Sequence, residues 1–228
     1  MKNDGLDQKI DYISPEIILE LYKSGIFLMG KERNDQNIYF VNPEKRALLP
    51  IKKFHCSKSF VRFCRKKPFQ VTIDKCFQNV IKSCATVNRE GTWINKIIEK
   101  KFIELHQMGH AHSIETWHEK ELVGGIYGVS IGSCFFAESM FSKKSNASKF
   151  ALINLVSRLN LLGYNLLDVQ FVNPHLKQFG VYELTRNKFK ELLNYALTID
   201  LNFHSLSFED EDLFENVLDF LQEISIKS

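Results

Sequence analysis

Two polar residues that could act on one reacting group stand close together near the end of a predicted strand. Asp168 and Gln170 lie two positions apart in the extended run 165–171, so we expect their side chains to point to the same face of a sheet. A carboxylate and an amide in that arrangement can work together. An aspartate that caps a loop is the alternative, and the residues alone leave both interpretations open.

A further acidic residue lies among apolar ones. Glu138 begins the run ESMFS, and the apolar side chains of Phe135 and Met140 flank it in the sequence. A carboxylate suits a cationic ligand through charge-assisted hydrogen bonds, whereas an apolar lining excludes polar side chains because their desolvation costs free energy. The alternatives are a solvated glutamate and ordinary core packing of the phenylalanine and the methionine.

Three histidines near one predicted helix end have a spacing that a metal site could use. His106 and His110 are four residues apart, and His112 follows them. No carboxylate or cysteine completes an obvious ligand set, so we expect structural hydrogen bonds and no metal ion. The five cysteines include no CxxC pair, which predicts reduced and mostly buried thiols. They are Cys56, Cys64, Cys76, Cys84 and Cys134.

The composition is that of a folded globular chain. Its 228 residues are 44% hydrophobic and 25% charged, which is enough to bury a sizeable core. No apolar run approaches the roughly 18 to 20 residues that cross a bilayer. The polar start MKNDGLDQKIDY is unlike a signal peptide, and we therefore expect a cytoplasmic protein.

The net charge of +3 conceals two segments of opposite sign. Residues 52–67 include many basic side chains and no acidic one, whereas residues 209–223 are strongly acidic. A basic segment suits a polyanion such as RNA, since phosphate contacts supply most of the non-specific affinity. A solvated helix face is the alternative.

Helix signals mark the first half of the chain. Ser14 and Pro15 open a predicted helix that Gly25 closes, and Ser57 caps a second helix that ends before Pro68. The other predicted elements of this half are extended pieces at 38–49, a strand at 69–73, and helices at 75–85 and 92–108.

Strand patterns replace helix patterns after Gly109. Predicted strands at 112–117, 122–131 and 134–138 are separated by short turns and form an antiparallel meander. A helix at 146–162, a strand at 165–171 and a helix from Thr185 to Leu197 follow. This order predicts an α+β fold in which helices flank a mixed sheet.

Several motifs, taken in order, give the chain a resemblance to a known family. They are GTWI at 91–94, GHAHSIETW from Gly109, ELVGGIYGV from Glu121, ESMFS from Glu138, NASK from Asn146 and the D-x-Q at 168–170. From about Arg46 to about Leu193 the sequence resembles the leucyl/phenylalanyl-tRNA-protein transferases. Any one motif alone is weak, but together they are highly specific.

The resemblance implies an acetyltransferase-like fold, also used by Fem-type aminoacyl ligases, with a smaller N-terminal domain packed on it. We expect the small domain at residues 1–56 and the catalytic domain at residues 57–228. The implied reaction moves leucine, phenylalanine or methionine from a charged tRNA to the N-terminal Lys or Arg of an acceptor protein, which marks that protein for degradation. The aminoacyl ester is already activated, so the resemblance implies neither ATP, metal nor other cofactor.

The resemblance also assigns roles to residues. Asp168 and Gln170 would be catalytic: the carboxylate would orient or help deprotonate the incoming amine, and the amide would bond to it and to the substrate. Glu138 would bind the acceptor peptide. The pocket for the aminoacyl side chain would include Trp93, Phe135 and Met140.

Contacts to tRNA would be sequence-independent, since such an enzyme reads the attached amino acid and the shared 3′ end. We expect a monomer that binds both charged tRNA and the acceptor protein. The candidate tRNA-binding residues are Lys58, Arg62, Arg65, Lys66 and Lys67 on the helix capped by Ser57, with Lys143 and Lys144 after ESMFS.

The chain departs from the family near its N-terminus. DYISP, GIFLMG and FVNP stand where most relatives carry GGDLS, GIFPWF and WWSP, and Val41 replaces a tryptophan. One alternative is therefore a catalytically degenerate relative that binds tRNA without transferring an amino acid. Another is an acyl-CoA acetyltransferase, although the chain lacks the Q/R-x-x-G-x-G/A loop that would grip the pyrophosphate of coenzyme A.

Overall fold

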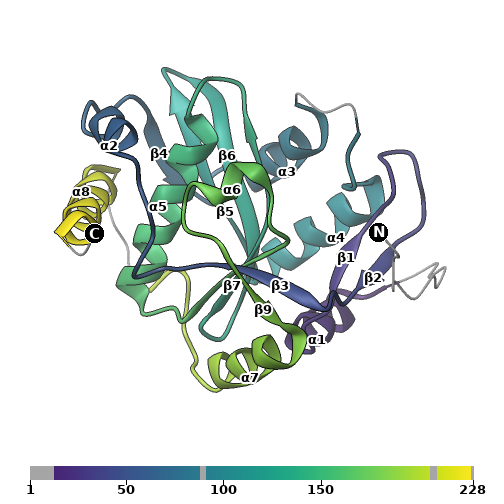
Figure 1. Cartoon of the computed structure of the whole chain (residues 1–228). Coiled ribbons are helices and arrows are strands. Elements are labelled where there is room, and N and C mark those ends of the chain that lie inside the picture. Colours follow the sequence, from purple (N-terminus) through teal and green to yellow (C-terminus); the bar gives the residue numbers. More distant parts are fainter. Residues whose placement is uncertain (1–12, 88–90, 206–209, 227–228) are drawn as a thin grey trace.

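A seven-stranded mixed sheet forms the centre of the computed structural model, which describes residues 13–87, 91–205 and 210–226 (Figure 1). Its strand order is β4-β5-β6-β7-β8-β3-β9, and all neighbours are antiparallel except β7 and β8, which run parallel. The predicted meander of β5, β6 and β7 is confirmed. The strands are β3 (Lys45–Leu49), β4 (Gln70–Ile73), β5 (Ala111–His118), β6 (Glu121–Ile131), β7 (Cys134–Ser142), β8 (Leu166–Gln170) and β9 (Tyr182–Thr185).

Helices cover both faces of this sheet (Figure 1). One layer contains α1 (Pro15–Lys23), α3 (Phe77–Thr86), α4 (Lys96–Gln107) and α7 (Arg186–Leu197). The other contains α2 (Lys58–Cys64), α5 (Ala147–Leu162), α6 (Pro174–Lys177) and α8 (Asp210–Ile226). Each layer buries its own hydrophobic cluster against the sheet, which confirms the predicted flanked mixed sheet; the likeness to acetyltransferases stays a prediction. Within the described residues, no helix has the length and apolar character needed to cross a membrane.

Side-chain caps confirm three predicted helix starts. The hydroxyl of Ser14 accepts a hydrogen bond from the backbone N–H of Ile17 at 3.4 Å, and that of Ser57 accepts one from Phe60 at 3.2 Å. Thr185 caps α7 in the same way. These bonds satisfy backbone donors that the first turn of a helix leaves unpaired, so local sequence is sufficient to place the starts.

A glycine in β6 sets how closely α5 lies on the sheet. A Cβ atom added at Gly124 would meet the backbone and the Cβ of Ala147, the first residue of α5, at 2.7 Å. Any larger residue would push the helix start away from the strand. The ELVGG run therefore fixes the position of the connection between β7 and α5.

β3 joins the N-terminal part of the chain to the main sheet. It lies between β8 and β9 and pairs with both, whereas β1 (Phe27–Met29) and β2 (Tyr39–Val41) form a separate two-stranded sheet. A division after residue 56 would cut the seven-stranded sheet. A small N-terminal domain with that boundary stays a prediction.

A buried ion pair connects β3 to β8. Arg46 is 1% exposed and Asp168 is fully buried. The Arg46 Nε lies 2.9 Å from both carboxylate oxygens, and Nη2 lies 2.6 Å from Oδ2. Nη1 donates to the carbonyl of Gly25 at 3.1 Å, and the guanidinium lies over the ring of Phe27. Because each charge is compensated by the other, β3 and β8 can both hold a charged residue in the core.

Replacing Arg46 by methionine should destabilise the protein by roughly 3–5 kcal/mol, because the Asp168 carboxylate would stay buried without its cation. The matched control is Lys45→Ala on the same strand, where the exposed amine lies 3.9 Å from Glu183 and the expected loss is about 0–1 kcal/mol. Urea unfolding at neutral pH measures both. Similar losses in the two variants would contradict a special role for the buried pair.

Candidate active site

A cavity of about 660 Å³ lies where β7 and β8 cease to pair. The two strands are paired only along Cys134–Phe136 and Leu166–Asp168, and the residues that follow on each strand line the cavity. A hollow of this size suits a small organic group. The early end of the pairing between β7 and β8 therefore leaves room for the cavity.

Both strands are bulged where they meet the cavity. In β7, the residues on either side of Glu138 pair with consecutive residues of β6, so Glu138 is an extra residue. In β8, the residues on either side of Val169 pair with consecutive residues of β3. A bulge changes the direction of the side chains around it and is common beside active sites.

Gln170 has an unusual backbone conformation that Asp168 supports. Its φ of 59° lies in the left-handed region, which residues other than glycine rarely adopt. The Asp168 Oδ1 accepts a hydrogen bond from the backbone N–H of Gln170 at 2.9 Å. The Gln170 side chain, in turn, donates through Nε2 to the Glu138 Oε1 at 3.3 Å. Asp168 thus positions the residue that reaches the cavity.

Glu138 sits in an environment that disfavours its charge. Burial raises its pKa to about 8, even though the hydrogen bond from Tyr22 favours the charged form. The Tyr22 hydroxyl donates to the Glu138 Oε1 at 2.8 Å, and burial beside this carboxyl raises the tyrosine pKa well above its ordinary value. Tyr22 therefore stays a donor, while Glu138 can gain or lose a proton near neutral pH.

The cavity brings together most of the site residues expected from the sequence. Trp93, Glu138, Met140 and Gln170 line it. Among the described residues, Glu138 is the only acidic one in the lining. Asp168 stays beneath the surface with both carboxylate oxygens facing Arg46. The predicted contact of Asp168 with an incoming amine therefore has no support in this geometry.

Phe135 is not among the residues that line the cavity, so its place in the aminoacyl pocket stays a prediction. Its ring is 1% exposed and packs against Phe203 with centroids 5.5 Å apart. The ring also covers Gly128, where an added Cβ would lie 2.4 Å from it. Phe135 belongs to the hydrophobic cluster under α5, and Met140, beyond the bulge at Glu138, packs against the same cluster while also lining the cavity.

Comparison with known proteins identifies the family. The model of the leucyl/phenylalanyl-tRNA protein transferase family matches residues 48–194. The chain belongs to this family. Three relatives carry the name leucyl/phenylalanyl-tRNA–protein transferase. The protein of Paramagnetospirillum magneticum is 44% identical over 81% of this chain and 90% of its own length. The protein of Rhizorhabdus wittichii is 46% identical over 82% of this chain and 76% of its own length. The protein of Hyphomonas neptunium is 45% identical over 83% of this chain and 74% of its own length.

The sequence does not identify two residues that contact the acidic groups of the site, Tyr22 and Arg46. Tyr22 is a buried residue of α1, and nothing in the sequence around it indicates that its hydroxyl reaches Glu138, 116 residues further along the chain. Arg46 directly precedes the apolar run ALL, and a charge at that place in a buried strand must have a partner. The identity of that partner depends on the pairing of β3 with β8.

The basic residues predicted to contact tRNA are all exposed. On and after α2, Lys67 lies 3.4 Å from Glu215 of α8. After β7, Lys143 lies 3.5 Å from Glu121, and the Lys144 amine lies 2.9 Å from His118. Phe69 follows α2 and packs against the ring of His118. The two basic groups of this transferase-family chain are therefore connected through Phe69 and His118.

The stability advantage of the wild type over Glu138→Gln should shrink as the pH rises from about 5 to about 9. Between the ordinary pKa of 4.5 and the raised value of about 8, the unfolded chain has lost the Glu138 proton while the folded chain retains it. Each pH unit in this window lowers the free energy of unfolding of the wild type by at most about 1.4 kcal/mol. Urea unfolding across the window measures the difference, and a constant difference would contradict the raised pKa.

Proposed function

We propose that this chain transfers leucine, phenylalanine or methionine from a charged tRNA to the N-terminal Lys or Arg of an acceptor protein, marking it for degradation. The main support is the contact of Gln170 with Glu138 in the wall of a cavity that also has apolar residues in its lining, in a chain of this family. We propose that the chain acts as a monomer in the cytoplasm, where charged tRNA is found.

The lining of the cavity supports an apolar aminoacyl group. Trp93, Ile126, Met140, Leu152 and Val169 all contribute to it. A polar side chain placed among these residues would lose its hydration without gaining hydrogen bonds, whereas leucine, phenylalanine or methionine would bury apolar surface. The flexible thioether of Met140 can adapt to more than one of these shapes.

Glu138 is suited to receive the acceptor amine. An N-terminal ammonium has a reference pKa of roughly 7.7–8.0, close to the value of about 8 for Glu138, so a proton can pass between them at little cost in free energy. The neutral amine then attacks the ester carbonyl: a C–N bond forms, and the C–O bond to the tRNA ribose breaks. Glu138 gives its proton to the departing ribose oxygen and then accepts the second proton that the nitrogen must lose to become an amide. Release of this proton to solvent restores the carboxylate, so one ammonium and one ester give one amide, one ribose hydroxyl and one proton.

Gln170 is suited to hold the amine during this attack. Its Nε2 donates to Glu138, which leaves the amide oxygen as an acceptor for an amine N–H at the same place. Asp168 acts in this scheme as a positioning residue, through the backbone of Gln170. The Tyr22–Glu138–Gln170 contacts favour catalysis over the degenerate tRNA-binding alternative, because mere binding of tRNA gives these buried groups no role.

Gln170→Ala should reduce transfer of leucine from Leu-tRNA to a peptide with N-terminal Arg by about 100-fold or more in kcat, since a preorganised hydrogen-bonding group is lost. Binding of the charged tRNA should stay unchanged. The matched control is Gln178→Ala, an exposed glutamine that bonds to Lys149, which should retain activity. Transfer of radiolabelled leucine and a filter-binding assay measure the two quantities. A wild-type chain that binds tRNA but forms no product would establish the degenerate alternative.

Arg62→Ala combined with Arg65→Ala should weaken tRNA binding. The fall of log affinity with log salt should become less steep, by about one unit of slope for each phosphate that the protein no longer neutralises. Both side chains are exposed on or beside α2. Lys188→Ala combined with Lys190→Ala, which removes two exposed cations of α7, is the charge-matched control and should change little. Filter binding at several salt concentrations provides the measurement. Equal effects of the two double substitutions would place the tRNA elsewhere.

A further inference from the structure

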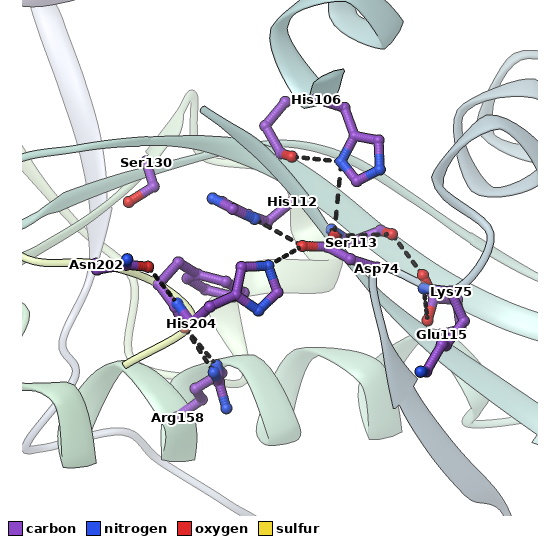
Figure 2. Close-up of polar contacts among 12 residues, drawn as sticks. Asp74, Lys75, His106, His112, Ser113, Glu115, Ser130, Arg158, Asn202 and His204 are labelled. Atoms are coloured by element: carbon purple, nitrogen blue, oxygen red, sulfur yellow. Dashed lines mark hydrogen bonds and ion pairs between the residues drawn. The ribbon is translucent and has the colours of Figure 1, made fainter. Parts of the chain in front are cut away.

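Two histidines and an aspartate form a cluster among the described residues. None of the three lines the cavity of the candidate active site. Asp74 follows β4, His112 is the second residue of β5, and His204 belongs to the segment between α7 and α8 (Figure 2). The Asp74 Oδ2 lies 2.7 Å from the His112 Nδ1 and 2.7 Å from the His204 Nε2. The three donor atoms all lie within 4.8 Å of one another.

We propose that Asp74, His112 and His204 bind a divalent transition-metal ion, specifically Zn²⁺. Two imidazole nitrogens and one carboxylate oxygen form a donor set typical of zinc, whereas Mg²⁺ and Ca²⁺ prefer oxygen ligands throughout. Zinc bonds to these groups are about 2.0–2.2 Å long, so one ion can reach all three after small side-chain adjustments. Water would complete the tetrahedral coordination.

The surroundings of Asp74 hold its carboxylate in place. The backbone N–H of Ser113 donates to Oδ1 at 2.6 Å, and the His106 Nδ1 lies 3.9 Å from the same oxygen. The other oxygen, Oδ2, faces His112 and His204 (Figure 2). A carboxylate whose second oxygen is already hydrogen-bonded is the usual arrangement of a metal ligand.

Neighbouring contacts also position the two imidazoles. The ring of Phe203 stacks on that of His112 with centroids 4.3 Å apart and an interplanar angle of 18°. The Arg158 Nε donates to the Phe203 carbonyl at 3.0 Å, and the Asn202 Oδ1 accepts from the His204 backbone at 2.8 Å. Arg158 also lies within electrostatic range of Asp74, so we expect weaker binding than at a four-ligand structural site.

The structure supplies partners that the sequence did not reveal. His112 lacked an acidic partner in the motif GHAHS, and folding brings Asp74 and His204 to it from distant positions. His204 lies beyond the segment 48–194 that matches the family model. Bound zinc would therefore fasten the segment leading to α8 onto the end of the sheet, a role separate from the proposed transfer reaction.

Titration of the purified, metal-stripped full chain with Zn²⁺ tests this site by calorimetry. One ion should bind per chain, and zinc at about 100-fold above the dissociation constant should raise the melting temperature by roughly 5–11 °C. His204→Gln should weaken binding at least about 10-fold. This substitution is suitable because the His204 side chain is 52% exposed, which limits the effect on folding. His110→Gln is the matched control and should bind as the wild type does.

Co²⁺ serves as a spectroscopic probe of the ligands, since the chain also contains five free cysteines. The expected spectrum shows visible d–d bands without the near-ultraviolet bands of thiolate coordination. The absence of saturable binding by the wild type would overturn the proposal. So would thiolate bands, or equal affinities of His204→Gln and His110→Gln.

Discussion

The salt bridge between Arg46 and Asp168 is the interaction on which the candidate active site depends. It crosses from β3 to β8 in the core and keeps both charges compensated away from water. Its carboxylate also accepts the backbone N–H of Gln170, which holds that residue in the left-handed region and its amide against Glu138. A buried ion pair often adds little net stability compared with apolar residues of the same size. Its value here lies in fixing the geometry at the end of β8.

Two carboxylates of the site have different partners and therefore different tasks. Asp168 contacts a guanidinium and positions the backbone, whereas Glu138 bonds to the neutral hydroxyl of Tyr22 and the amide of Gln170. Burial raises the Glu138 pKa to about 8, because neither of these neutral partners compensates a full negative charge. Environments that separate two acids in this way commonly distinguish a proton-transfer group from a structural one.

Local chemistry explains how much of this structure could be predicted from the sequence. The capping residues and helical spacing identified α1, α2 and α7, and alternation identified the antiparallel meander. The position of β3, the parallel pairing of β7 with β8, and the two bulges depend on contacts between distant segments. The family resemblance indicated Glu138 and Gln170, but no local signal indicated Tyr22, whose contact with Glu138 joins segments 116 residues apart. His112 was weighed as a metal ligand from the sequence, but its distant partners Asp74 and His204 were not.

Asp168 is expected to hold Gln170 and Glu138 in position without touching the substrate. A crystal structure of the chain with a non-hydrolysable aminoacyl-adenosine, carrying phenylalanine through an amide bond, tests this most directly. We expect the phenylalanine ring beside Trp93 and Met140, the carbonyl near Gln170, and Asp168 still paired with Arg46. Binding of the aminoacyl group outside this cavity, or a direct contact between Asp168 and the ligand, would contradict this role.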